Sequence, residues 1–211
     1  MILIVDYGLG NLASVRNAFR AVGADVQVSS NPEDVARADG LVLPGVGAAS
    51  AGMQRLRQRG LEAPIREAAA ASVPVLAICL GMQLLFDRSE EGDATCLGLI
   101  GGMVRRLRGE IKVPHIGWNE VTVESGTTLF AGVTSDPYYY FVHSYVCEPV
   151  DMGVVAGTTE YGGTFCSAVQ WGSIWGTQFH PERSGTEGLR LIENFSELCK
   201  FDRKIPSPTP S

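Results

Sequence analysis

Cys79 lies in the segment VLAICLGMQL (75–84), between an apolar run and a second apolar pattern with helical spacing. The run 75–78 predicts a buried strand and the residues beyond Cys79 predict a helix, so Cys79 would occupy a sharp strand-to-helix turn. Such a turn presents its central side chain, and the start of the next helix favours a thiolate and directs N–H groups toward an oxyanion. The pattern therefore indicates a nucleophile. The alternative is a buried, inert cysteine, which is common for a free thiol.

A cysteine nucleophile needs a base, and the sequence contains only three histidines. His180 follows a strand-like segment, 174–179, and precedes a proline, which favours an extended backbone. In an extended segment His180 and Glu182 point the same way, so the carboxylate can orient the imidazole. With the cysteine, these two residues form a candidate triad. The other histidines, His115 and His143, are interpreted as structural.

A glycine-rich segment, PGVG (44–47), follows the predicted strand 40–43. Glycine lets a backbone approach a substrate closely and tolerates unusual φ angles. Chemistry in open α/β sheets gathers at the carboxyl ends of the strands, so this loop is expected near Cys79 and could supply an oxyanion-hole N–H group. Taken alone, PGVG is equally compatible with a simple turn, and it is too short and lacks the lysine of a phosphate-binding loop.

Strand and helix patterns alternate through the first half of the chain. The predicted strands are 1–5, 25–30, 40–43 and 73–78. The predicted helices are 11–22, 31–38, 51–71 with a break near Gly60 and Pro64, 82–89, and the closing helix 186–201. This alternation predicts an α/β fold, an open, mostly parallel sheet with helices on both faces. The second half carries strand and turn signals, which predict antiparallel additions in the C-terminal half, extending the sheet or forming a second one.

The composition predicts one globular domain over 1–200, followed by a Pro/Ser-rich, loose tail, 201–211. The chain has 211 residues, of which 45% are hydrophobic and 19% charged. A net charge of −6 and the absence of a long Lys/Arg run argue against nucleic-acid binding. The sequence shows no signal peptide and no membrane span. Five scattered cysteines without a CxxC pair predict free thiols, no metal site and a cytoplasmic location.

Together these segments resemble the class I, triad-type glutamine amidotransferases. CLGMQ (79–83) and HPE (180–182) are typical of that superfamily. PGVG (44–47) and PHIGWN (114–119) together resemble the glutaminase subunits of imidazole glycerol phosphate synthase. The resemblance also includes DYGLGNLASV (6–15) and YFVHSY (140–145), and it covers nearly the whole chain except the tail.

The resemblance implies a role for each matching residue. Cys79 would be the nucleophile, His180 the general base and acid, and Glu182 the residue that orients His180. The oxyanion hole would be formed by the N–H groups of Leu80 and Val46. The glutamine pocket would be lined by Gly45, Gly47, Gln83, Glu91, Ser144 and Tyr145. The contacts with a cyclase partner would be made by Leu9, Asn11, Trp118, Tyr140 and Arg183.

Two pocket residues also fit on physical grounds. Glu91 suits the ammonium group of the substrate, and Gln83 lies one helical turn beyond Cys79, where it can meet a carboxamide.

Two positions depart from the family pattern. Ala77 stands where glycine is usual before the nucleophile, and Arg183 stands where lysine is common after HPE. Arginine is a planar fork and not an equivalent of lysine, so partner docking could differ in detail.

The implied reaction is hydrolysis of L-glutamine through a Cys79 thioester, with no metal or organic cofactor. The ammonia would pass to a cyclase subunit with a (β/α)8 barrel in a heterodimer, which makes imidazole glycerol phosphate and an aminoimidazole carboxamide ribotide in histidine biosynthesis. The isolated chain is expected to be a poor glutaminase if the PGVG peptide is misoriented until the partner's ligand binds. Three alternatives stay open: a glutaminase serving another synthase, a cysteine peptidase on a similar fold, and a catalytically silent α/β binding module.

Overall fold

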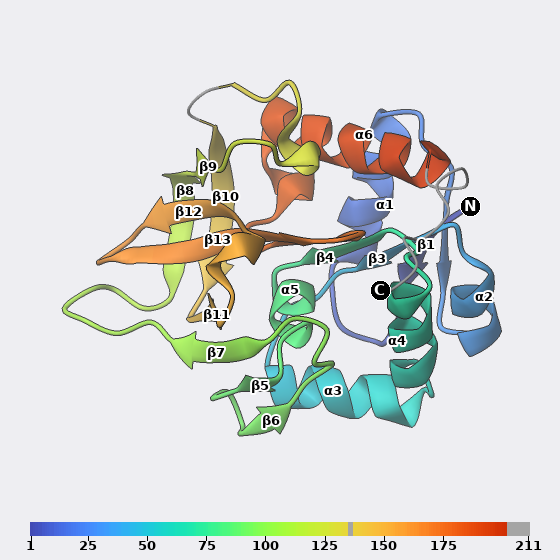
Figure 1. The fold of residues 1–211 in the computed structure, drawn as a ribbon, viewed down its shortest axis with the longest axis horizontal. Coiled ribbons are helices and arrows are strands. Elements are labelled where there is room, and N and C mark those ends of the chain that lie inside the picture. The colour runs from blue at the N-terminus through green and yellow to red at the C-terminus, as the bar shows by residue number, and fades with distance from the viewer. Residues whose placement is uncertain (135–136, 202–211) are drawn as a thin grey trace, which may run out of the picture.

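The computed structural model describes residues 1–134 and 137–201 (Figure 1). Up to residue 101 the elements are β1 (Ile2–Val5), α1 (Leu12–Ala21), β2 (Val26–Ser29), α2 (Pro32–Arg37), β3 (Gly40–Leu43), α3 (Ala49–Gln58), α4 (Glu62–Ala70), β4 (Val75–Ile78), α5 (Leu80–Leu84), β5 (Arg88–Ser89) and β6 (Ala94–Thr95). Beyond it are β7 (Gly102–Arg106), β8 (His115–Glu120), β9 (Thr122–Val123), η1 (Thr128–Phe130), β10 (Tyr138–His143), β11 (Tyr145–Pro149), η2 (Met152–Val154), β12 (Val155–Glu160), β13 (Thr164–Trp171), β14 (Ile174–Thr177), η3 (Pro181–Arg183) and α6 (Gly185–Phe201).

The main sheet has the order β2-β1-β3-β4-β14-β13-β11-β7-β5-β6, with β12 and β9 branching from β13. Strands β2, β1, β3, β4 and β14 pair in parallel, whereas β14, β13, β11 and β7 pair antiparallel. Strands β8 and β10 form a separate antiparallel pair. The predicted antiparallel additions are therefore confirmed, and they both extend the main sheet and form a second one.

Helices cover both faces of the parallel strands. Figure 1 shows α1 and α6 on one face and α3, α4 and α5 on the other. Strand β1 explains why: Leu3 and Val5 belong to one buried apolar cluster, while Ile2 and Ile4 belong to the other. A strand buried on both faces is apolar throughout, which is what the continuous run at the N-terminus predicted. The predicted fold class is confirmed.

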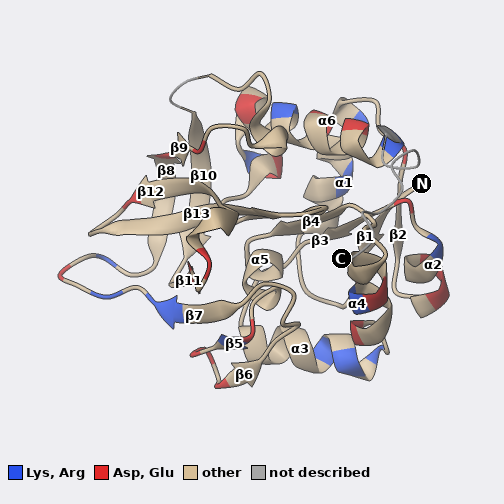
Figure 2. Ribbon diagram, viewed as in Figure 1, with Lys and Arg blue, Asp and Glu red and all other residues tan. Residues whose placement is uncertain are grey.

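Charged side chains lie around this apolar centre rather than within it. Figure 2 shows Lys and Arg on α3 and on β7, and acidic residues on α2 and α6, while β1, β3 and β4 carry no charge. Among the residues that the structure describes, no helix is long and apolar enough to cross a membrane.

Local capping confirms two predicted helix starts. The Asn11 side chain accepts a hydrogen bond from Ser14 N at 3.3 Å, and Asn31 accepts one from Glu33 N at 3.0 Å. These side chains satisfy N–H groups that a helix leaves without partners at its start. The break near Gly60 is also confirmed, since α3 and α4 end and begin on either side of it.

Two predicted details were wrong. Pro64 does not interrupt a helix, because it lies in the first turn of α4, where a proline is tolerated. The helix predicted over 82–89 spans Leu80–Leu84 instead. It ends there because the Leu84 and Leu85 carbonyls accept hydrogen bonds from the turn at 97–100, after which 88–89 forms β5.

The predicted closing helix is confirmed as α6, Gly185–Phe201. Leu191 is fully buried, because α6 contacts α1 and other elements over a wide stripe. Phe201, which the predicted helix 186–201 and the predicted tail 201–211 both include, is the last residue of α6. The rest of the predicted loose tail lies outside the described residues.

Candidate active site

Cys79 occupies the turn between β4 and α5, with φ 54° and ψ −107°. A positive φ is strained for a residue with a side chain, and it turns the chain abruptly from strand into helix. Neighbouring β3 and β14 hold β4 on both sides. Gly81 allows the tight approach of α5, since a Cβ atom there would lie 1.8 Å from Leu43 O. The predicted sharp strand-to-helix turn is therefore present.

His180 and Glu182 form a buried pair next to Cys79. His180 Nδ1 lies 2.8 Å from Glu182 Oε1, and their side chains are only 5% and 2% exposed. Burial lowers the pKa of His180, but the interactions with Cys79 and Glu182 outweigh burial and raise the pKa to about 10. The imidazole is thus held protonated, the form that stabilises a neighbouring thiolate.

The backbone that brings Glu182 to His180 differs from the prediction. His180 is extended, but residues Pro181–Arg183 form the 3-10 turn η3 instead of continuing the strand. The Ser184 hydroxyl donates to His180 O at 2.6 Å and closes this turn. A turn, and not strand alternation, therefore sets the contact between imidazole and carboxylate.

A pocket of about 390 Å³ opens beside the cysteine. The predicted residues that line it are Val46, Gly47, Cys79, Leu80, Gln83, Glu91, Ser144 and Tyr145. The unpredicted ones are Ala48, Pro114, Val142 and His143. Loop 44–47, helix α5, the β5–β6 connection and the β10–β11 junction thus meet around one space.

Gly45 is the one predicted pocket residue that does not line this space. It packs behind the loop, where an added Cβ would lie 2.3 Å from the Tyr7 hydroxyl and 2.8 Å from Leu80 Cβ. The fully buried Tyr7 donates a hydrogen bond to Pro44 O at 2.6 Å and fixes the start of PGVG. The sequence did not indicate a role for Tyr7, because that role depends on a hydrogen bond to a residue 37 positions away and no local pattern reveals it.

The two residues that carry the candidate oxyanion donors both line the pocket. Leu80 is the first residue of α5, so its N–H group is one that the helix cannot satisfy internally. Val46 lies in the PGVG loop and is exposed.

Gln178 is a neighbour of the nucleophile that the sequence analysis missed. Its Nε2 lies 3.6 Å from Cys79 Sγ, and its Oε1 accepts a hydrogen bond from Gln83 Nε2 at 3.0 Å. Gln83 Nε2 also donates to Tyr145 O at 3.2 Å, which leaves the Gln83 carbonyl oxygen for a ligand. Strand alternation from His180 could have found Gln178, since residues two apart share a side.

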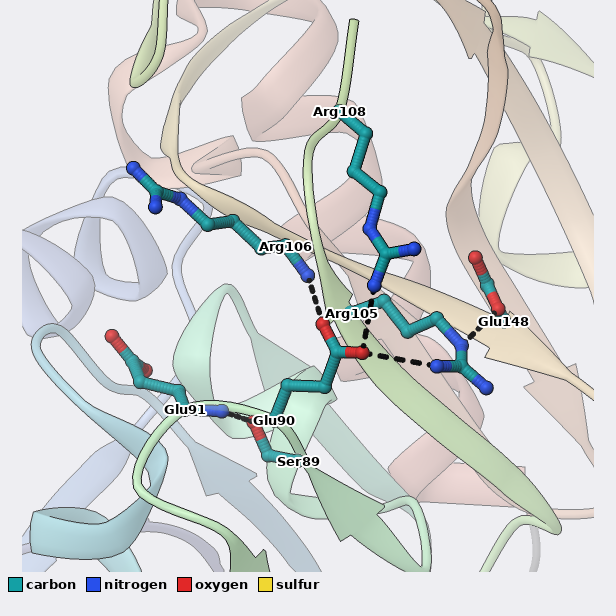
Figure 3. Close-up of polar contacts among 7 residues, drawn as sticks. All are labelled: Ser89, Glu90, Glu91, Arg105, Arg106, Arg108 and Glu148. Atoms are coloured by element: carbon teal, nitrogen blue, oxygen red, sulfur yellow. Dashed lines mark hydrogen bonds and ion pairs between the residues drawn. The ribbon is translucent and has the colours of Figure 1, made fainter.

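Glu91 is held at the pocket edge by the start of α3. Its Oε2 accepts a hydrogen bond from Ala49 N at 2.9 Å. Burial raises the pKa of Glu91, and the Ala49 N–H group partly opposes that rise. Figure 3 shows Glu91 beside Glu90 and the arginines of β7.

The two histidines interpreted as structural form a buried pair at the pocket. His143 Nε2 lies 2.9 Å from His115 Nδ1, and His143 Nδ1 lies 2.9 Å from Tyr145 O. Burial is the main cause that lowers the pKa of His143 to about 3, so it stays neutral and can donate to that carbonyl. Both histidines thus support the pocket wall through Tyr145.

Three of the predicted partner-contact residues gather on the surface. Arg183 Cζ lies 4.1 Å from the centre of the Tyr140 ring, and the Trp118 and Tyr140 rings are 6.3 Å apart. Trp118 is 55% exposed. Leu9 and Asn11 lie on the loop between β1 and α1, where Leu9 is half-buried and Asn11 is exposed.

Fold and site together define a nucleophile-elbow enzyme class with a Cys-His-Glu arrangement. The chain belongs to the class I glutamine amidotransferases, because the family model described as "Glutamine amidotransferase class-I" matches residues 3–198. A solved structure described as a glutamine amidotransferase superposes with a TM-score of 0.75 at 20% identity, covering 94% of this chain and 98% of the other. The structure of PurLQS from Thermotoga maritima gives a TM-score of 0.72 at 17% identity, covering 93% and 97%.

Within this family the chain is similar over nearly its full length to imidazole glycerol phosphate synthase subunit HisH from several bacteria. It is 50% identical to that subunit from Symbiobacterium thermophilum, with 98% of each chain covered. It is 46% identical to that from Dehalococcoides mccartyi, with 97% of this chain and 100% of the relative covered. The subunit from Moorella thermoacetica is 48% identical, with 94% and 95% covered.

Proposed function

We propose that this protein is the glutaminase subunit of an imidazole glycerol phosphate synthase and hydrolyses L-glutamine to glutamate and ammonia. The observation that carries the proposal is the elbow cysteine beside a buried His180–Glu182 pair at the edge of a pocket. The identity of 46–50% to HisH subunits over nearly the whole chain supports this particular glutaminase.

In the proposed mechanism the Cys79 thiolate attacks the side-chain carbonyl carbon of glutamine. The carbonyl oxygen gains negative charge, which the N–H groups of Leu80 and Val46 would stabilise. When the tetrahedral intermediate collapses, His180 gives its proton to the departing nitrogen and ammonia leaves. A glutamyl thioester remains on the cysteine.

Water completes the reaction. The neutral His180 takes a proton from water, which attacks the thioester carbonyl and releases glutamate and the thiolate. Glu182 holds Nδ1 throughout, so Nε2 stays directed toward the reacting atoms. In the pocket, Glu91 would accept from the substrate ammonium group, and the Gln83 carbonyl oxygen would accept from a substrate N–H group.

The ammonia has to reach a second active site before water protonates it. We therefore infer a heterodimer with a (β/α)8-barrel cyclase that uses ammonia to make imidazole glycerol phosphate and an aminoimidazole carboxamide ribotide in histidine biosynthesis. The surface cluster of Trp118, Tyr140 and Arg183, in which Trp118 and Arg183 are exposed, supports a docking face next to His180. All five cysteines are free, which fits the cytoplasm as the compartment.

The test is glutamate release from L-glutamine, with and without the cyclase subunit and its nucleotide ligand. Wild type should be active mainly with both present. Cys79→Ser should lose about 10³-fold or more in kcat, because a hydroxyl is a much weaker nucleophile. If a subunit of a different synthase activates glutamate release, that subunit and not the cyclase is the partner. No glutamate under any condition would favour an α/β binding module instead.

A further inference from the structure

Glu90 lies just after β5, and its carboxylate reaches across to β7 (Figure 3). Its Oε1 accepts hydrogen bonds from Arg105 Nη1 at 3.0 Å and Arg108 Nη2 at 3.1 Å. Its Oε2 accepts one from Arg106 N at 3.0 Å, and its own N–H group donates to Val104 O at 2.9 Å. Charge-assisted hydrogen bonds of this kind are stronger than neutral ones and fix geometry as well.

The end of β7, where the Arg106 N–H group donates to Glu90, also supports the pocket. Arg106 pairs with Tyr145 in the antiparallel register of β7 and β11. The next residue, Leu107, donates its N–H group to Ser144 O at 2.9 Å. Ser144 and Tyr145 both line the pocket. Glu90 therefore contacts the backbone directly behind one wall of the candidate glutamine site.

The pocket lining also includes Glu91, the residue next to Glu90. The carboxylate of Glu91 is bound to Ala49 N on α3, on the far side from β7. Arg105 extends the link in the other direction, since its Nε donates to Glu148 Oε2 on β11 at 2.7 Å. The short β5–β6 connection is thus held between α3 and the β7–β11 pair, and Glu90 forms the β7 side of that attachment.

We propose that Glu90 is a positioning residue that sets the spacing between Glu91, the proposed partner of the glutamine ammonium group, and the Ser144–Tyr145 backbone. The inference rests on the proposed glutaminase function and adds a determinant of substrate affinity to it. Glu90 touches no reacting atom, so its loss weakens glutamine binding and leaves the chemical step intact.

The experiment uses Glu90→Gln in the complex with the cyclase and its nucleotide ligand. The variant keeps the shape of the side chain and removes its charge. We expect the KM for L-glutamine to rise about threefold to tenfold, with kcat within about twofold of wild type. A matched control is Glu33→Gln, which breaks the exposed Glu33–Arg37 ion pair on α2 and should leave both constants unchanged.

A ligand without the ammonium group separates positioning from general damage. 4-Carbamoylbutanoate is glutamine without its α-amino group, so its inhibition constant should be the same in wild type and Glu90→Gln. An unchanged KM for glutamine, or an equal loss of affinity for both ligands, would overturn the inference. If Glu90→Gln unfolds, Arg108→Gln removes one donor and should give a smaller KM rise with the same dependence on the ammonium group; no such rise also overturns it.

The outcomes also separate this inference from the function on which it rests. Wild type that releases no glutamate would overturn the proposed function and the inference together. If wild type is active and the KM of Glu90→Gln for L-glutamine is unchanged, only the inference is overturned.

Discussion

The five cysteines differ in their surroundings, although all are free and buried. Burial raises the pKa of Cys96 to about 11 and that of Cys166 to about 12, and it raises the pKa of Cys147 as well. Cys79 instead lies beside a protonated histidine at the edge of a pocket. The environment, and not exposure, therefore distinguishes the candidate nucleophile from the other thiols.

We expect iodoacetamide at pH 7 to modify Cys79 about tenfold faster than any other cysteine, because only a thiolate reacts at a useful rate. Peptide mass spectrometry after timed quenching measures the five rates separately. A glutamine analogue that occupies the pocket should protect Cys79 selectively. Equal rates at all five sites would instead support a structural cysteine.

Some of the candidate site residues could be predicted from the sequence and others could not. Cys79, His180 and Glu182 were found because type, order and neighbouring turn residues all carried signal. Glu90 and the pocket position of His143 were not, because their partners lie far away in the chain. Gln178 was missed although it lies only two residues before His180. Contacts between distant segments leave no local pattern, so only the folded backbone brings them together.

The elbow between β4 and α5 determines where the nucleophile is placed. The position of this elbow depends on close packing of α5 against the end of β3. That packing is possible because Gly81 has no side chain. The sequence predicted both strands and the turn, because apolar runs and glycines are local signals. It overestimated the length of α5, since the turn at 97–100 binds the last helical carbonyls from a distance in the chain.

We expect Gly81→Ala to destabilise the protein by about 2 kcal/mol or more, because its Cβ would overlap Leu43 O at 1.8 Å. Glutaminase activity should fall with it, as the elbow shifts. Denaturant unfolding measures the change. Gly101→Ala is the matched control, since the nearest atom to its Cβ would be Asp87 Oδ2 at 3.9 Å. A Gly81→Ala variant as stable as this control would contradict the packing argument.

The molecule as a whole combines a covered parallel sheet with a partly exposed two-stranded sheet. Strands β8 and β10 carry exposed Trp118, Ile116 and Tyr138, while the buried His143 of β10 lines the pocket and contacts His115 of β8. The proposed docking face and the pocket thus share this two-stranded sheet. A single domain over 1–200 stays a prediction, and so does the partner.

We expect Trp118→Ala to raise the dissociation constant for the cyclase about tenfold or more, because large exposed aromatic side chains are frequent hot spots of binding energy. Trp171→Ala is a close control: Trp171 is 53% exposed but lies at the end of β13, outside the β8–β10 pair. Its removal should change the constant less than twofold. Titration calorimetry measures both. Equal effects of the two substitutions would place the interface elsewhere.

The backbone conformation of Cys79 also bears on how this sequence can evolve. A side chain at φ 54° costs roughly 1–2 kcal/mol relative to glycine, which adopts that region freely. Folding alone would therefore favour glycine at position 79. The conformation of Cys79 is thus a cost to folding that its proposed role as the nucleophile would offset.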